Sequence, residues 1–320
     1  MGPEPTLRQL RHFLSLAEHR HFSRAAEACL ITQSSLSASI KELETLLGVT
    51  LFERTKRSVM MTPMGRNMVD MARRVTAAVD DVTDMARGAG APLSGDLHMG
   101  VIPTIGPFLL PRVLPGLRDA YPDLRLYLRE EQTAFLLRRL ADGDLDLALI
   151  ALPYKMDKVS VFEFADDPFL AVFPRGHAMG AFETMTPTRM DRDSLLVLEG
   201  GHCLTDQTLA LGKLSEAVPM NRFQATSLHT LVQMVDNGLG VTVLPKMAVD
   251  SGILRGLKLD FRPFSSPGAS RRIALVWRNT SRRGDEFQTL GECLRDELAT
   301  PIRGQATSGK AVRAGLPSKN

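Results

Sequence analysis

The sequence predicts two kinds of fold in one chain: an all-α N-terminal domain that continues into a long linker helix, and an α/β domain of two lobes. Three patterns lead to this prediction. Two short helical segments, joined by two residues, precede a basic hairpin within residues 7–66. An apolar heptad pattern starts at residue 64, and beyond residue 96 strand-like segments alternate with amphipathic helical segments.

The first short helix of the N-terminal domain has one apolar face. Phe22, Ala25, Ala26 and Cys29 recur at positions i, i+3, i+4 and i+7, and Ser23 is placed to cap the helix. We therefore expect this face to be buried in the domain.

The second short helix follows at once. Thr32 is a natural N-cap, Gly48 is a natural C-terminal stop, and the apolar stripe between them consists of Leu36, Ile40, Leu43 and Leu47. Its exposed positions are polar: Gln33, Ser34, Ser35, Ser37 and Lys41. Short hydrogen-bonding side chains near a helix N-terminus suit base edges in the major groove, and the cations that follow suit phosphates: Arg54, Lys56 and Arg57.

Charge is distributed unevenly along the chain. Residues 7–66 carry nine Lys and Arg against five Asp and Glu, a balance of +4, whereas the whole chain carries +3. An ordinary helical hairpin with a solvated polar face is the alternative to a DNA-binding domain. The concentration of positive charge where the two helices lie favours DNA binding.

Six segments of the N-terminal region resemble the winged helix-turn-helix of LysR-type transcriptional regulators. They are Leu10-Arg-His-Phe-Leu, Phe22-Ser-Arg-Ala-Ala-Glu, Gln33-Ser-Ser-Leu-Ser, Ile40-Lys-Glu-Leu-Glu, Leu47-Gly-Val and Leu51-Phe-Glu-Arg. The resemblance implies that residues 32–47 contain the recognition helix and that residues 54–57 lie in the wing. It also implies that the partner is double-stranded promoter DNA.

A heptad pattern follows the hairpin. Thr62 and Pro63 supply an N-cap and a first-turn proline, and apolar residues then recur at spacings of four and three: Met64, Met68, Met71, Val75, Ala78, Val82 and Met85. A helix packed only on its own domain usually shows a wider apolar stripe than this narrow seam. We therefore predict a coiled-coil dimerisation helix, and in the resembling family the linker helix pairs two subunits.

The segment of residues 88–95 is rich in Gly and Pro, which predicts a hinge. Strand-like segments follow at 96–102, 124–129, 146–152, 169–173, 195–198, 241–244 and 273–277, with helical patterns at 111–120, 133–142, 228–237 and 285–298. This alternation predicts an α/β fold with mainly parallel strand pairing. The length of this region predicts two lobes with a cleft between them.

The C-terminal region resembles the effector domain of the same family, which is similar to a periplasmic binding protein whose chain crosses between its lobes twice. The resemblance places the crossings near Ala165 and Pro267. The sequence is therefore divided into a winged helix-turn-helix domain (1–62), a linker and dimerisation helix (63–87), a hinge (88–95), a two-lobed effector domain (96–302) and a disordered tail (303–320).

The three cysteines bear on redox chemistry. The sequence shows neither a signal peptide nor a run long enough to span a membrane, which predicts a cytoplasmic protein with reduced thiols. Cys29 and Cys293 lie on apolar helical faces, where cysteine acts as a small hydrophobe.

Cys203 lies in a different setting, between an apolar strand-like segment with a Gly pair and a helix expected to begin at Thr205 or Asp206. A thiol at a helix N-terminus faces free backbone N–H groups and the positive end of the helix dipole, both of which favour the thiolate. The alternative from position alone is an inert loop cysteine.

The segment Gly201-His-Cys-Leu-Thr-Asp-Gln207 resembles the peroxidatic motif of OxyR, the peroxide-sensing branch of the LysR-type family. The likeness extends to Ile102-Pro-Thr-Ile-Gly-Pro107, Glu131-Gln-Thr133, Ala225-Thr-Ser-Leu228 and Ser270-Arg271. It implies that Cys203 is the redox-sensing residue and that a peroxide pocket is formed by Thr104, Thr133, His202, Asp206 and Arg271.

The sequence departs from that motif at two positions. Gly212 stands where the family carries its resolving cysteine, and Thr205 stands where the enteric form of the motif has Arg. An oxidised Cys203 would then persist as a sulfenic acid, form a mixed disulfide, or pair with another subunit or a distant cysteine.

Together these patterns predict a homo-oligomeric transcription activator, a dimer of dimers, that binds promoter DNA, works with RNA polymerase in the cytoplasm and controls antioxidant genes in response to hydrogen peroxide. No cofactor, metal, membrane or enzymatic turnover is expected. One alternative is a regulator that binds a small metabolite in the cleft, near Thr104, Thr226 and Ser227. Another is a cysteine hydrolase or peroxidase, although His202 and Cys203, as neighbours on a strand-like segment, would point apart.

Overall fold

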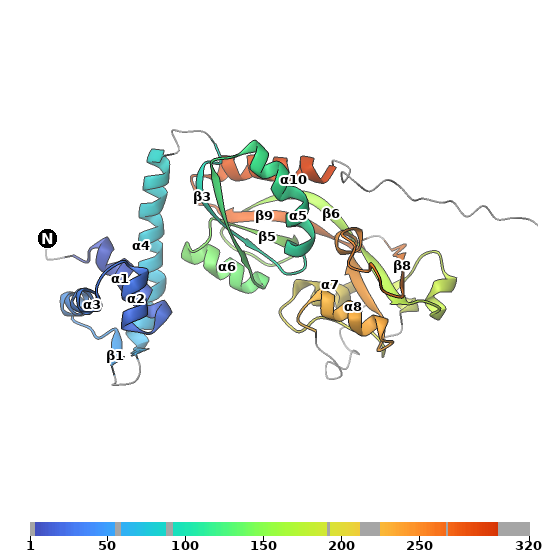
Figure 1. Ribbon diagram of the computed structural model, residues 1–320, viewed down its shortest axis with the longest axis horizontal. Coiled ribbons are helices and arrows are strands. Elements are labelled where there is room, and N and C mark those ends of the chain that lie inside the picture. Colours follow the sequence, from blue (N-terminus) through green and yellow to red (C-terminus); the bar gives the residue numbers. More distant parts are fainter. Residues whose placement is uncertain are drawn as a thin grey trace, which may run out of the picture.

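The computed structural model describes residues 4–54, 59–87, 92–190, 193–211, 225–266 and 268–299 (Figure 1). Their buried side chains form three separate hydrophobic cores, one in the N-terminal domain and one in each of two lobes of the C-terminal region. Within these residues no helix combines the length and the apolar character needed to cross a membrane. The predicted tail at 303–320 lies outside them.

The N-terminal domain consists of three helices and a two-stranded wing: α1 (Leu7–His19), α2 (Phe22–Ala28), α3 (Gln33–Leu47), β1 (Phe52–Arg54) and β2 (Val59–Met61). Leu36, Ile40 and Leu43 of α3 are fully buried. Both predicted ends of α3 are confirmed. The Thr32 hydroxyl accepts a hydrogen bond from the Ser35 backbone N–H at 3.2 Å, and Gly48 ends the helix in the left-handed conformation at φ +67°.

Two predictions for α2 were wrong. The helix begins at Phe22, so Ser23 lies inside its first turn and its hydroxyl donates to Gln33 Oε1 at 2.9 Å instead of capping the helix. Cys29 is the C-cap residue and is only half-buried. Because α2 has only seven residues, its contribution to the core comes from the central pair Ala25 and Ala26.

The linker helix α4 (Pro63–Arg87) starts as the sequence predicts. Pro63 is its first residue, and the Thr62 hydroxyl accepts from the Gly65 backbone N–H at 2.9 Å. Val69 and Ala72 are buried in the core of the N-terminal domain. One side of α4 is thus used for packing within the chain.

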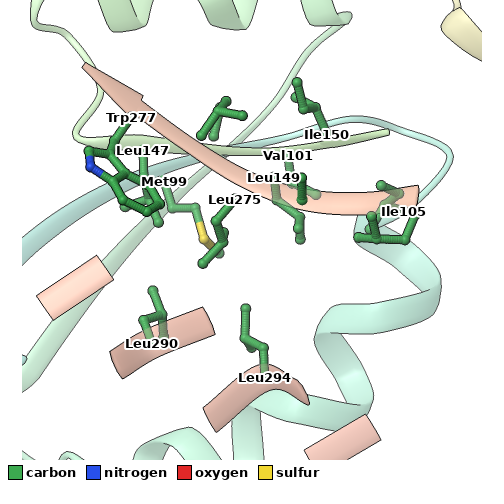
Figure 2. Packing of buried hydrophobic residues seen from close by; sticks show 14 of the residues in the cluster. Met99, Val101, Ile105, Leu147, Leu149, Ile150, Leu275, Trp277, Leu290 and Leu294 are labelled. Carbon is green, nitrogen blue, oxygen red and sulfur yellow. The ribbon is translucent and has the colours of Figure 1, made fainter. Parts of the chain in front are cut away.

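The first lobe is built on β4 (Leu124–Glu130), β3 (Gly95–Val101), β5 (Leu147–Leu152), β9 (Ser270–Arg278) and the first part of β6 (Val159–Pro174). Its helices are α5 (Gly106–Ala120), α6 (Thr133–Asp142) and α10 (Gly284–Ala299). Figure 2 shows Leu147 and Leu275 of the sheet above Leu290 and Leu294 of α10. All six side chains of β5 are buried, because β5 lies in the interior of the sheet.

The second lobe contains the end of β6 together with β7 (Thr242–Pro245) and β8 (Leu259–Pro263). Its helices are α7 (Cys203–Leu211), α8 (Leu228–Asp236) and α9 (Lys246–Asp250), with short 3-10 turns at Ala178–Ala181 and Pro187–Arg189. Strand β6 pairs with β9 as far as Pro168 and with β7 from Phe169 onward. The chain therefore crosses between lobes on β6, a few residues after Ala165, whereas Pro267 lies outside the described residues.

Strand pairing differs from the prediction of mainly parallel neighbours. Among the strands of the described residues, β3 pairs in parallel with β4 and β5, whereas β9 runs antiparallel to β5 and β6, and β6 runs antiparallel to β7 and β8. The reason is that β6 and β9, the longest strands, run in opposite directions beside each other. The isolated bridges of the second lobe are parallel. The segment 195–198 is also not a strand, since it makes only isolated bridges through Leu195 and Leu198.

Candidate functional site

Cys203 lies where the two lobes meet. It is the first residue of α7, and it packs in the core of the first lobe, whereas the next residue, Leu204, packs in the core of the second. Only 4% of Cys203 is exposed. The helix begins earlier than the predicted Thr205 or Asp206, and its first turn is tied back by the Thr205 hydroxyl, which donates to the Leu198 carbonyl at 3.0 Å.

The protonation of the thiol reflects competing influences. Burial raises the pKa of Cys203 and is the strongest of them; the Arg271 cation, the Thr133 hydroxyl and the Leu204 backbone N–H lower the pKa, and the Asp206 carboxylate raises it. The expectation that the helix N-terminus favours the thiolate holds for that contribution, but the net shift of the pKa is in the opposite direction. The N–H contribution exists, but removal of the sulfur from water outweighs it.

The turn before Cys203 is held from the first lobe. Gln132 precedes α6, and its Nε2 donates to the Gly200 carbonyl at 3.5 Å. Gly201 has φ +96°, and a Cβ there would lie 2.4 Å from Gln132 Oε1. A side chain at this position would have a strained backbone and would displace the end of the Gln132 side chain, so the turn favours glycine.

Arg271 is the central cation of the site. Its side chain is fully buried and lies on β9 at the junction of the lobes. The guanidinium donates to Thr104 Oγ1 and to the Thr104 carbonyl, each at 2.8 Å, and to Asp167 Oδ2 through Nε at 3.0 Å and Nη2 at 2.9 Å. Thr104 and Arg271, two of the predicted pocket residues, are thus in direct contact.

Thr133 supplies a buried hydroxyl that faces the thiol. It is the first residue of α6, and it is 1% exposed. Its Oγ1 is buried without a nitrogen or oxygen hydrogen-bond partner in the described part of the chain, and it lies beside the Cys203 thiol. A buried polar atom of this kind is rare in native proteins and indicates a place for a small polar ligand or water.

The other two predicted pocket residues have different environments. His202 is buried, burial lowers its pKa, and the Glu199 carboxylate, 4.0 Å from Nε2, partly opposes that shift, so its ring is neutral at pH 7. Asp206 is exposed on the first turn of α7, and its charge raises the pKa of Cys203. Asp206 therefore does not stabilise a thiolate.

Two residues of the site were missed by the sequence reasoning. Asp167 contacts Arg271, and Gln132 contacts the turn before Cys203. The sequence did contain a signal for Asp167, because it precedes an apolar strand segment. A carboxylate that is buried with such a strand needs a hydrogen-bonding or charged partner. Gln132 carries no signal that distinguishes it from a surface residue.

The predicted DNA-contacting residues of α3 are mostly exposed. Gln33, Ser34, Ser35 and Lys41 are exposed on α3, and Ser37 is half-buried. The backbone of Arg54 lies in β1, whereas Lys56 and Arg57 lie outside the described residues. The N-terminal turn of α3 is ordered by its own hydroxyls, since Thr32 Oγ1 lies 2.8 Å from Ser35 Oγ.

The predicted seam of α4 is largely exposed to solvent in the single chain. The exposed fractions are 50% for Met64, 57% for Met71, 45% for Val75 and 61% for Val82, while Ala78 is also exposed and Met68 is half-buried. The Met85 side chain is not among those described. An apolar stripe of this length is unusual on a monomer surface. Met68 is the seam residue that packs against the core of the N-terminal domain.

Comparisons with known proteins cover nearly the whole chain. The bacterial regulatory helix-turn-helix protein of the lysR family matches residues 7–66, and the LysR substrate binding domain matches residues 90–299. The chain belongs to the LysR family. Members of this family are transcriptional regulators, and the N-terminal domain is accordingly a DNA-binding helix-turn-helix. Among the described residues no group of three His, Cys, Asp or Glu side chains is arranged to hold a metal ion.

Two relatives that match nearly the full length are named for a peroxide response or for DNA binding. A probable hydrogen peroxide-inducible genes activator from Streptomyces viridosporus is 40% identical over 94% of this chain and 97% of its own. The DNA-binding transcriptional dual regulator OxyR of Escherichia coli is 39% identical over 91% and 95%. The chain is therefore OxyR-like.

Solved structures of similar LysR regulators agree with the fold. A full-length OxyR variant from Pseudomonas aeruginosa superimposes with a TM-score of 0.76 at 36% identity, over 92% of this chain and 95% of that one. An OxyR mutant from Corynebacterium glutamicum, described as H2O2-bound, gives a TM-score of 0.64 at 35% identity over 93% and 94%. The two-lobed effector domain predicted from the sequence is thereby confirmed.

Proposed function

We propose that this LysR-family protein is a transcription activator that senses hydrogen peroxide through Cys203. One observation carries the proposal: the buried thiol lies at a helix N-terminus, beside the Thr133 hydroxyl, which has no nitrogen or oxygen partner among the described residues, and within the field of the buried Arg271 cation. A small, uncharged molecule that both donates and accepts hydrogen bonds suits such a site. The relatives named as hydrogen peroxide-inducible genes activators support peroxide as that molecule.

The chemistry needs no further reagent. The Cys203 sulfur, as thiolate, attacks one oxygen of H2O2; the S–O bond forms while the O–O bond breaks. The departing hydroxide takes up the proton that the thiol released and leaves as water. Sulfur is oxidised by two electrons to the sulfenic acid, and peroxide is reduced by the same two electrons.

The surrounding residues have distinct parts in this step. Thr133 Oγ1 is available to hydrogen-bond the peroxide, because no other described nitrogen or oxygen uses it. Arg271 stabilises negative charge on the sulfur and on the departing oxygen. His202, neutral at pH 7, and Thr104, fixed by Arg271, complete the polar lining.

The fate of the oxidised sulfur follows from the positions of the other cysteines. Gly212, which replaces the resolving cysteine of the resembling motif, lies outside the described residues. Cys29 belongs to the N-terminal domain and Cys293 to α10 of the first lobe. We propose that Cys203 persists as sulfenic acid or forms a mixed disulfide with a small thiol.

The proposal extends to assembly. The apolar seam of α4 pairs two subunits, so that two α3 helices meet double-stranded promoter DNA, and a dimer of dimers forms in the cytoplasm. RNA polymerase is the further partner of an activator that controls antioxidant genes. A metabolite in the cleft is less favoured, because the Ser227 hydroxyl caps α8 and the Thr104 hydroxyl accepts from Arg271.

Peptide mass spectrometry after one equivalent of H2O2 tests the sensor. Cys203 should gain one oxygen or a small-thiol adduct, while Cys29 and Cys293 remain reduced. Thr133→Val removes the unpartnered hydroxyl at nearly constant shape, and we expect it to slow oxidation of Cys203 by roughly tenfold, the effect of about 1.4 kcal/mol. Oxidation spread evenly over the three cysteines would refute the proposal.

A further inference from the structure

Asp167 and Arg271 form a fully buried ion pair at the junction of the lobes. The side chains are 2% and 0% exposed, and one carboxylate oxygen, Asp167 Oδ2, accepts from both Nε and Nη2 of Arg271. The two residues face each other across β6 and β9, one position before β6 leaves β9 and enters the second lobe. The pair therefore lies at a crossing between the lobes.

Each residue of the ion pair also forms hydrogen bonds with a different lobe. Asp167 Oδ1 accepts from the Met247 backbone N–H of α9 at 2.8 Å, which ties it to the second lobe. Arg271 donates to the hydroxyl and carbonyl of Thr104, which ties it to the first lobe. Asp167 is thus fixed at both oxygens, and four donated hydrogen bonds fix the guanidinium.

The burial of Arg271 requires a carboxylate partner. An arginine side chain does not lose its proton in proteins, and a buried cation without an anion carries a large desolvation penalty. Without Asp167, the guanidinium would turn toward water and its hydrogen bonds to Thr104 would be lost. The planar fork of arginine makes this orientation sensitive to where the carboxylate lies.

We propose that Asp167 is a positioning residue for the chemistry of Cys203: it holds the Arg271 guanidinium against Thr104 and so keeps a cation at the thiol. This inference rests on the proposed function, since a slower reaction with peroxide is its consequence. The Cys203 pKa that tests it is measured without peroxide.

Two effects of Asp167 on Cys203 have opposite signs. Its negative charge, taken alone, disfavours a nearby thiolate, so its removal would lower the Cys203 pKa. Its hold on Arg271 favours the thiolate, so loss of that hold would raise the pKa. The other groups that act on the thiol are the Asp206 carboxylate and the Leu204 N–H of α7, and the Thr133 hydroxyl of α6. His202, neutral at pH 7, and Glu199 lie in the preceding turn.

The test is the pH profile of Cys203 alkylation in the full chain, read by peptide mass spectrometry with iodoacetamide. Asp167→Asn should raise the apparent pKa by about one unit, which means roughly tenfold less thiolate at neutral pH, and should slow peroxide oxidation by a similar factor. The control is Asp166→Asn, an identical change at the exposed neighbouring residue, which should titrate like the wild type.

Each result of these titrations either supports or overturns the proposed role of Asp167. A lowered pKa in Asp167→Asn would mean that only the direct charge acts, and an unchanged pKa would mean a purely structural role; either overturns the proposal. If Asp167→Asn fails to fold, Asp167→Glu is the second variant. It keeps the charge, but its extra methylene displaces the guanidinium in a closed site, so it should also raise the Cys203 pKa. A wild-type pH profile for Asp167→Glu would overturn the proposal. A wild-type Cys203 that reacts with peroxide no faster than free cysteine would instead refute the proposed function, because alkylation does not involve peroxide.

Discussion

At the scale of single residues, the reactivity of Cys203 depends on a balance between burial and three stabilising groups. Burial removes the sulfur from water and raises the pKa, while Arg271, Thr133 and a backbone N–H oppose the shift. A sensor with this balance keeps most of its thiol protonated at neutral pH. The minority thiolate then meets peroxide in a site that already holds the donors needed by the departing oxygen.

The raised pKa of Cys203 predicts the pH dependence of sensing. Oxidation by peroxide should accelerate as pH rises through the range 7 to 9, by close to tenfold for each unit, and level off only above pH 9, because the pKa is raised from its ordinary value of 9.0. Rapid-quench alkylation with peptide mapping measures this rate. A rate that is flat across this range would mean that the thiolate already predominates.

The same shift has a consequence for folding. Because the folded state holds the Cys203 proton more tightly than the unfolded chain does, its contribution to stability is present below the unfolded pKa and is lost as pH rises toward the folded pKa. Urea denaturation of wild type and Cys203→Ser should therefore converge or cross as pH is raised above about 8.5. Parallel stability curves from pH 7 to pH 10 would argue against a raised pKa.

Much of this site could be predicted from the sequence, but its electrostatics could not. The segments that resemble the peroxide-sensing branch identified Thr104, Thr133, His202 and Arg271, all of which are buried, and Thr104 and Arg271 are in contact. The direction of the thiol pKa was wrong, because the packing of Cys203 into the core of the other lobe depends on tertiary structure. Asp167 was missed for the same reason, since its partner lies 104 residues away in the sequence.

At the scale of elements, helices were predictable where their caps are local. The ends of α3 and the start of α4 follow from Thr32, Gly48 and Thr62, whose side chains or backbone act within a few residues. Strand direction was not predictable in this way. The antiparallel pairing of β6 with β9 joins residues more than a hundred positions apart, and alternation of strands and helices says nothing about it.

The exposed face of α3 predicts how DNA is read. Gln33→Ala should reduce discrimination at one base pair by about 1–3 kcal/mol, whereas Lys41→Ala should weaken binding to all sequences and lower the salt slope by about 1. Fluorescence anisotropy on operator and scrambled DNA at several salt concentrations separates the two effects. Equal losses on both DNAs for Gln33→Ala would assign it to the phosphate backbone.

The exposed seam of α4 predicts how subunits pair. Met71→Asp places a charge at the centre of the stripe, where pairing would bury it without a partner, so dimers should dissociate at concentrations that keep the wild type paired. Asn67→Asp, which adds the same charge at an exposed position of the same helix outside the stripe, is the matched control. Sedimentation velocity compares the two variants, and a fully dimeric Met71→Asp protein would rule out this seam.

At the scale of the whole molecule, α6 connects the sensor to the linker helix. Thr133 at its first residue lies beside Cys203, and Gly143 at its C-cap lies against α4. Arg73 of α4 contacts Asp142 at 3.1 Å and Asp144 at 3.6 Å, which adds two partly exposed ion pairs to this contact. A shift of α6 on oxidation would therefore displace α4, the helix that positions the DNA-binding domain.

Gly143→Ala tests that connection. Gly143 has φ +84°, and a Cβ there would lie 2.4 Å from the Ala77 Cβ, so the substitution adds both backbone strain and a clash that pushes α4 away from α6. Gly238→Ala is the matched control, because φ is +76° and nothing lies within 4 Å of its added Cβ. Both variants should lose about 1–2 kcal/mol of stability from left-handed backbone strain. Only Gly143→Ala should uncouple the sensor from the DNA-binding domain. In this variant Cys203 should oxidise normally, yet the DNA footprint should no longer change with peroxide. A normal peroxide-dependent footprint in Gly143→Ala would mean that the signal reaches the DNA-binding domain by a path other than α6 and α4.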